Sequence, residues 1–293
     1  MGYSKRLRGG NCAVIDTGVD YTHEDLAQNI WVNTKEIPDN EIDDDGNGYI
    51  DDVYGIASGY YDFSDIKIND PMDFYGHGTH VARIIGAVGN NGKGVVGVNW
   101  NVKILPCNAF NPNLEGFSIS AIIECCEYIA SLKDRGENIR VINASYGGSC
   151  YSHAEESVIQ ELRNRGILFI AAAGNKRENN DILPTYPCNY NLANIICVAS
   201  TDKDDNLSWF SNYGNSVHVA APGENIFSTY PITPTNFNHL TAPIIYFLTI
   251  LNQEQETGIL NHLRVFLQNT LLAQLILLQI LLKETIQIML QLF

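Results

Sequence analysis

Asp16, His77 and Asn175 are the residues whose types and positions offer the most chemistry. Asp16 follows the apolar run "AVI" and precedes "TG", which places a carboxylate at the end of a strand. His77 lies between glycines in "YGHGTHVA", where an imidazole can take and return a proton. Asn175 ends "FIAAAGN", where its amide can donate to a developing oxyanion. Each also has a plainer interpretation: Asp16 and Asn175 are of residue types common in turns, and His77 could be a polar residue of a first helical turn. His80, three residues further on, lies within the predicted helix and is expected to be structural.

A second group of candidates lies in the acidic stretch "DDDGNGYIDD". Residues at alternate positions match the first nine positions of a calcium loop, with Gly at the sharp turn. They are Asp43, Asp45, Asn47, Tyr49 and Asp51. Tyr54 stands at the twelfth position, where such a loop has a bidentate Glu. The alternative is a solvated acidic loop; we favour calcium, because clustered carboxylates repel one another unless a cation is present.

The elements that position these residues alternate between strands and helices. Short apolar runs that end in Gly, Asn, Asp or Ser predict buried parallel strands at 12–18, 102–107, 139–145, 167–175 and 194–200. Helical spacing is found at 80–88, 118–132 and 153–166, the last ending on Gly166. The sequence therefore predicts an α/β fold, a parallel sheet flanked by helices on both faces, with its site at the carboxyl ends of the strands.

Composition excludes some classes of function. The net charge of -15 and the lack of a basic cluster exclude nucleic acid as a partner. The apolar run 271–282 is too short and too interrupted by Gln for a membrane span of about 20 residues. The start of the chain has no apolar run typical of a signal peptide. Seven cysteines are an odd number, so they cannot all pair in disulfides. The sequence does not indicate an oligomeric state.

The order of the motifs adds a family resemblance. "VIDTGVDYTHEDL", "YGHGTHVARIIGA", "NASYGG", "AAAGN" and "FSNYGNSVHVAAPGENIFST" together closely resemble the subtilisin-like serine proteases, the subtilases. The resemblance covers nearly everything from Cys12 to Tyr230. In that family a catalytic triad in the order Asp, His, Ser is built on a parallel α/β sheet.

The resemblance implies a role for each matching residue. Asp16 orients the imidazole and stabilises its charged form, His77 is the general base and then the acid, and Asn175 supplies the oxyanion-hole amide. Two segments are expected to hold an extended polypeptide substrate by main-chain hydrogen bonds and to wall a pocket for its side chain. Their residues are Ser145, Tyr146 and Gly147, and Ala173 and Gly174.

The resemblance also implies calcium and a secretory location. Subtilases often depend on calcium, which strengthens the assignment of the acidic loop and suggests Asp25, with the loop near Asn90, as a further calcium site. Members of the family are commonly secreted, so localisation in the secretory pathway is expected from the resemblance alone.

The third member of the triad is missing. The family's nucleophilic Ser lies about two dozen residues beyond the "APG" motif, here 221–223, but residues 232–293 contain no serine and no cysteine. We therefore divide the chain into an N-terminal remnant, 1–11, an incomplete peptidase domain, 12–230, and an aberrant tail rich in Leu, Ile and Gln, 231–293, which we expect to be helical.

Two hypotheses account for the missing serine. In one, the sequence represents a serine endopeptidase whose C-terminal part was altered, by a frame shift or a splicing error. In the other, the chain is a non-catalytic relative that binds peptide and calcium. In both, the chain as written is inactive.

Overall fold

A parallel sheet carries the strands that end near the candidate residues. The computed structural model describes residues 10–58 and 69–228, and all of them lie in one unit, Met1–Thr249. The sheet has seven strands, and each neighbouring pair is parallel. In spatial order they are β2 (Ile56–Ala57), β3 (Lys103–Asn108), β1 (Asn11–Asp16), β6 (Ile139–Ala144), β7 (Leu168–Ala172), β8 (Ile195–Thr201) and β9 (Val219–Pro222).

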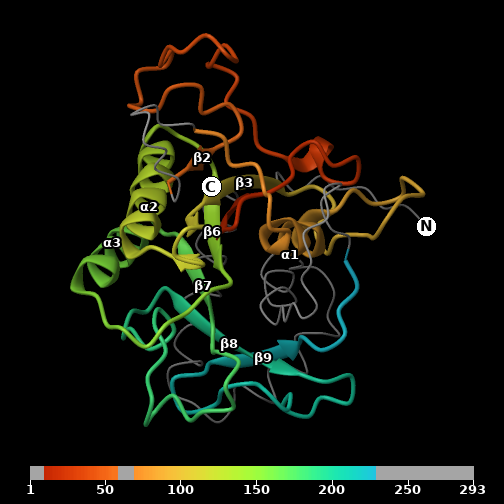
Figure 1. The fold of residues 1–293 in the computed structure, drawn as a ribbon, viewed down its shortest axis with the longest axis vertical. Helices are drawn as coiled ribbons and strands as arrows, with labels where there is room; N and C mark the ends of the chain where they lie inside the picture. Colours follow the sequence, from red (N-terminus) through yellow and green to blue (C-terminus); the bar gives the residue numbers. More distant parts are fainter. Residues whose placement is uncertain (1–9, 59–68, 229–293) are drawn as a thin grey trace, which may run out of the picture. The chain divides into compact units, whose positions relative to one another are not determined.

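The helices cover both faces of this sheet. α2 (Ile119–Asp134) and α3 (His153–Asn164) lie on one face, and α1 (His77–Gly86) lies on the other (Figure 1). A 3-10 turn, η1, spans Ala27–Asn29, and β4 (Phe110–Asn111) pairs with β5 (Gly116–Phe117) in a separate antiparallel hairpin. The predicted α/β fold, with helices on both faces of a parallel sheet, is confirmed.

The main core lies between the sheet and the helices α2 and α3. Phe169, Ile142 and Tyr128 are among its fully buried members. A disulfide, Cys107–Cys125, joins β3 to α2 inside this core, and a second one, Cys188–Cys197, ends in β8. Cys12, Cys126 and Cys150 are free, so the odd count leaves unpaired cysteines as expected.

The strand order makes β1 the topological switch point of the sheet. β3 lies on one side of β1 and β6 on the other, so the chain winds outward in both directions from this strand. In open α/β sheets, such a point opens a crevice at the carboxyl ends of the strands. Asp16 is the last residue of β1 and therefore lies at this place. The predicted tail, 231–293, lies outside the described residues.

Candidate active site

Asp16 and His77 form a close pair at the end of β1. His77 Nδ1 lies 2.6 Å from Asp16 Oδ1. The Asp16 side chain is fully buried, whereas 20% of the His77 side chain is exposed. A buried carboxylate on Nδ1 fixes the ring orientation and the tautomer, which leaves Nε2 as the atom that exchanges protons.

The charge of Asp16 governs the titration of His77. Burial lowers the pKa of the His77 imidazole, but the Asp16 charge and its hydrogen bond, with a further contribution from Asp73, raise the pKa above its ordinary value. The protonated imidazole is thus stabilised next to a carboxylate that lacks contact with solvent. Such an environment suits a group that must hold a proton for part of a reaction.

A glycine lets helix α1 approach the end of β1 closely. A Cβ on Gly78 would lie 2.0 Å from the carbonyl oxygen of Gly18 and 3.0 Å from Asp16 Cβ. The Gly78 backbone N–H donates to Thr17 Oγ1 at 2.9 Å. The first turn of α1, which begins at His77, is therefore anchored on the residues that follow Asp16.

A second buried carboxylate, Asp73, holds the same two segments together. Its Oδ1 accepts hydrogen bonds from Thr17 Oγ1 at 2.9 Å and from the backbone N–H groups of Tyr75 and Gly76 at 2.9 and 2.8 Å. Its Oδ2 accepts from the backbone N–H and the hydroxyl of Thr79 at 2.9 and 2.6 Å. Burial raises the pKa of Asp73, and these hydrogen bonds oppose that shift. Asp73 thus connects the end of β1 to the start of α1.

Asn175 lies two strands away from Asp16, beyond the end of β7. The residue is exposed. Ala173 is buried, and its backbone N–H donates to the Val198 carbonyl at 2.9 Å. Gly174 has φ of 115°, which turns the chain outward after the strand.

The segment predicted to pair with substrate follows β6 directly. Tyr146 is 7% exposed, Ser145 is half-buried and Gly147 is exposed. The side chain of Ser145 accepts from Asn143 Nδ2 at 2.9 Å. Next in the chain, Gly148 exchanges two backbone hydrogen bonds with Tyr186, at 2.9 and 2.7 Å. This pairing fixes one end of the segment.

A row of aromatic rings joins the two predicted parts of the site. Tyr75, two residues before His77, packs against Phe110 with ring centroids 4.3 Å apart. Phe110 contacts Phe117 at 5.6 Å, and Phe117 stacks on Tyr146 at 5.1 Å. The hairpin of β4 and β5 therefore fills the space between the start of α1 and the 145–148 segment with apolar surface.

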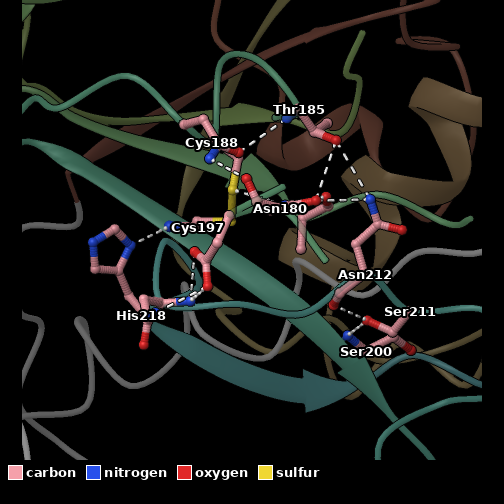
Figure 2. Close-up of a disulfide and its surroundings, with 12 residues drawn as sticks. Asn180, Thr185, Cys188, Cys197, Ser200, Ser211, Asn212 and His218 are labelled. Carbon is pink, nitrogen blue, oxygen red and sulfur yellow. Dashed lines mark hydrogen bonds between the residues drawn. A yellow bond between two sulfur atoms is a disulfide. The ribbon is translucent and has the colours of Figure 1, made fainter. Parts of the chain in front are cut away.

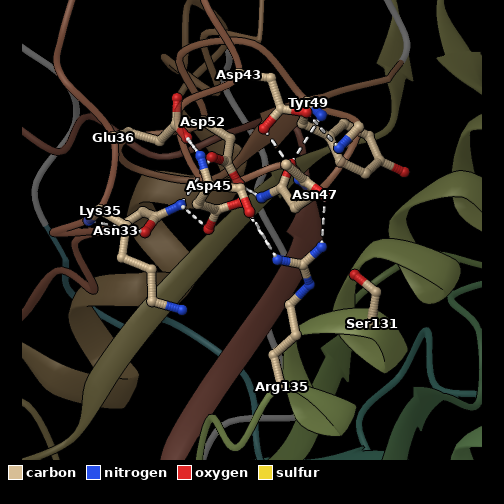
Figure 3. A network of polar contacts seen from close by, with 12 residues as sticks. Asn33, Lys35, Glu36, Asp43, Asp45, Asn47, Tyr49, Asp52, Ser131 and Arg135 are labelled. Carbon is tan, nitrogen blue, oxygen red and sulfur yellow. Dashed lines mark hydrogen bonds and ion pairs between the residues drawn. The ribbon is translucent and has the colours of Figure 1, made fainter.

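The acidic loop brings together two of its five predicted calcium ligands and adds another. Carboxylate oxygens of Glu36, Asp43 and Asp45 lie within 4.8 Å of one another (Figure 3). Glu36 is buried, and its oxygens accept from the backbone N–H groups of Asp45 and Asp51 at 3.0 and 3.2 Å. Burial raises the pKa of Glu36. Sequence spacing did not identify Glu36, because it lies outside the acidic run.

The other three predicted ligands have different surroundings. The Asp51 carboxylate accepts from the backbone N–H groups of Asn40 and Glu41 at 3.3 and 3.0 Å. Asn47 donates from Nδ2 to Asp52 at 2.9 Å and accepts from the Tyr49 backbone N–H at 2.7 Å. The Tyr49 ring packs edge-on against Tyr128 with centroids 4.9 Å apart.

A side-chain cation reaches the same loop. Arg135 follows α2 and donates to the Gly46 carbonyl at 2.8 Å and to Asp45 Oδ1 at 3.4 Å (Figure 3). The loop therefore receives one positive charge from the chain itself.

The second expected calcium site has a cationic partner for its carboxylate. Asp25 is fully buried and accepts from the Arg83 guanidinium, from Asn91 Nδ2 at 2.7 Å and from the Val95 N–H at 3.0 Å. Burial raises the pKa of Asp25, but these hydrogen bonds and Arg83 lower it overall. Asn90 has φ of 60° in the same loop. Arg83 satisfies the charge of Asp25, and a calcium ion here stays a prediction.

Within 10–58 and 69–228, none of the helices has the length and apolar character needed to cross a bilayer.

Comparison with known proteins places these features in one family. The profile of the subtilase family matches residues 8–248, which includes 18 residues beyond Tyr230. "Subtilisin-like protease 1" of Plasmodium vivax is 38% identical over 248 residues, which cover 78% of this chain and 38% of that protein. "Thermophilic serine proteinase" of Bacillus sp. (strain AK1) is 38% identical over 239 residues, which cover 82% of this chain and 49% of that protein.

A solved structure gives the same result for the fold. A cold adapted subtilisin-like serine proteinase superposes with a TM-score of 0.60 at 25% identity, covering 88% of this chain and 80% of that one. The chain spans less than half the length of the two curated relatives described above.

Proposed function

The chain belongs to the subtilase family, and from this premise we propose that its site is that of a serine-type endopeptidase acting on extended polypeptides. The observation that carries the proposal is the 2.6 Å hydrogen bond between buried Asp16 and partly exposed His77. Together with Asn175 beyond β7, it supplies a base with its orienting carboxylate and an amide donor at one edge of the sheet.

Each of these residues has a defined task in peptide hydrolysis. His77 Nε2 accepts the proton of a nucleophilic hydroxyl and then gives it to the leaving amine. Asp16 stabilises the imidazolium in between, which agrees with the raised pKa of His77. Asn175 donates to the oxyanion; loss of such a donor lowers the rate about a hundred- to a thousandfold. The 145–148 and 173–174 segments hold the substrate backbone.

We propose further that the chain as written does not turn over substrate. Ser228 is the last serine of the sequence. Its hydroxyl donates to the His80 carbonyl at 3.1 Å, and Ser208 and Ser211 are buried and bonded to Ser200. Without a nucleophile, a subtilisin-like site retains only about a thousand- to ten-thousandfold of its rate enhancement over water.

A fluorophosphonate probe tests this proposal directly. The reagent labels only a serine activated by a base, so we expect no labelling of the full chain, with an active subtilisin as positive control. Labelling at any serine would show that the chain has a working nucleophile. A peptide that binds the unlabelled chain, and is lost when a substitution in the 145–148 segment blocks main-chain pairing, would support a non-catalytic peptide-binding role instead.

We propose calcium as the ligand of the acidic loop, with Glu36, Asp43 and Asp45 as its carboxylate donors. The support is the convergence of three carboxylates, whose oxygens lie within 4.8 Å of one another, with a long 3.4 Å ion pair from Arg135 to Asp45. Bound calcium would neutralise the remaining repulsion and rigidify the loop between β1 and β2.

To test calcium binding, the ion is removed with a chelator and then added back, and the melting temperatures of the two samples are compared. We expect the melting temperature to rise when calcium is returned. Glu36→Gln should abolish the rise. The matched control is Asp39→Asn, which removes one charge from an exposed residue of the same loop. Equal loss in both variants would show that only bulk charge matters.

We also propose that the protein folds in an oxidising compartment such as the secretory pathway. Two disulfides, Cys107–Cys125 and Cys188–Cys197, support this location.

A further inference from the structure

The motif "FSNYGN" contains a buried residue, Asn212, that has no role in the site described so far. Asn212 is 1% exposed. Its backbone N–H donates to the Gly174 carbonyl at 2.9 Å, and its Oδ1 accepts from the backbone N–H groups of Lys176 at 2.8 Å and Glu178 at 3.1 Å. These bonds hold the residues immediately before and after Asn175.

Asn212 also packs tightly against the backbone of Gly174. A Cβ on Gly174 would lie 2.5 Å from Asn212 Nδ2 and 2.9 Å from its Cγ. Gly174 has φ of 115°, a conformation that side chains with a Cβ rarely adopt. Gly174 is therefore required by both its backbone angle and the position of Asn212.

The other end of the Asn212 amide is held by a buried network. Its Nδ2 donates to Asn180 Oδ1 at 2.9 Å and to Thr185 Oγ1 at 3.4 Å, and the three side chains face one another beside the disulfide (Figure 2). Asn180 Nδ2 donates to the Ala173 carbonyl at 2.8 Å and contacts Cys188 Sγ at 3.6 Å. The amide of Asn212 thus has one orientation, with its oxygen toward the Asn175 loop.

We propose that Asn212 is a positioning residue that fixes the Asn175 side-chain amide in the orientation needed to stabilise an oxyanion. This inference rests on the role proposed above for Asn175. The backbone carries the side chain, so rotation of the peptides around Asn175 would displace its amide. A displacement of about 1 Å in a catalytic site can cost about a hundredfold in rate.

Amide hydrogen exchange and nitrogen NMR on the full chain test the proposal without requiring peptide hydrolysis. In Asn212→Ala, the backbone amides of Lys176 and Glu178 lose their acceptor. We expect their exchange to accelerate about tenfold or more relative to the backbone amides of β7 and β8. The side-chain amide of Asn175 should lose order at the same time, which a purely structural role of Asn212 would not require.

Asn194→Ala is the matched control. Asn194 is a buried Asn that donates to the Ile159 and Ile167 carbonyls at 3.1 and 3.2 Å, at the amino end of β7. It should destabilise the protein without selective exchange at 176 and 178. Asn212→Asp keeps an acceptor oxygen, so it should protect these two amides better than Asn212→Ala and serves if the alanine variant does not fold.

Two results would overturn the proposal: unchanged order of the Asn175 amide in Asn212→Ala, or the same change in Asn194→Ala. Failure of the wild-type chain to bind any extended peptide would instead contradict the proposed function. The two failures are therefore distinguishable.

Discussion

Asp16 controls His77 through its charge and its hydrogen bond, and this pair makes the first prediction. In Asp16→Asn the buried imidazole loses the negative charge that opposes the effect of burial, so the pKa of His77 should fall by about 1–3 units. The titration of the His77 ring proton by NMR measures this. The exposed Asp70→Asn variant removes the same charge and should leave the pKa of His77 unchanged.

The sign of the stability effect follows from the direction of the shift. The folded-state pKa of His77 is raised, so its pairing with Asp16 contributes stability that is fully present below the unfolded pKa of about 6.5. That contribution is lost as pH rises through the folded pKa. A His77 pKa unaffected by Asp16→Asn would contradict the proposed pairing.

The sequence indicates some residues of the site and misses others for a physical reason. Asp16, His77 and Asn175 follow strands or open a helix, and these places are visible from local apolar patterns. Asp73 and Asn212 act through hydrogen bonds to partners such as Thr17 and Lys176, 56 and 36 residues away. Such partners meet only after the sheet has formed.

At the scale of elements, the sequence indicates the long buried strands and the three helices but not the short pieces. β1, β3, β6, β7 and β8 are runs of five to seven mostly buried residues, so their apolar pattern is clear. β2, β4 and β5 have two residues each, too few to show a period, and they exist through pairing with longer or neighbouring segments.

The docking of α1 onto β1 gives a prediction at the scale of elements. Gly78→Ala would place a Cβ 2.0 Å from the Gly18 carbonyl oxygen, so either the helix or the 16–18 turn must move. We expect a loss of about 1–3 kcal/mol in the free energy of unfolding, measured with urea. The pKa of His77 should fall as well, because the movement lengthens the hydrogen bond to Asp16.

Gly116→Ala in β5 is the control for this substitution. Its Cβ would meet only the Leu114 carbonyl oxygen, at 3.6 Å, which is an ordinary contact. Equal stability of the two alanine variants would show that α1 does not depend on the close approach at Gly78.

At the scale of the whole molecule, His80 connects α1 to the last described segment. The His80 carbonyl accepts from Ser228 Oγ at 3.1 Å, and its side chain is 4% exposed. Burial, followed by the His77 and Arg83 charges, lowers the pKa of His80 to about 4, and a backbone hydrogen bond with Ile226 only partly opposes this. Burial also lowers the pKa of His218, just before β9.

The lowered pKa values of these two histidines predict a loss of stability in acid. Between pH about 6.5 and about 4 the unfolded chain binds a proton at His80 that the folded chain does not, so stability falls as pH decreases. His80 alone should lower the free energy of unfolding by about 3 kcal/mol over this range. Urea unfolding at a series of pH values should therefore show a flatter dependence in His80→Gln than in wild type, while the exposed His153→Gln keeps the wild-type slope. If His80→Gln and wild type lose stability in parallel, the acid sensitivity arises elsewhere, and His80 is not the buried neutral group that links α1 to residues 226–228.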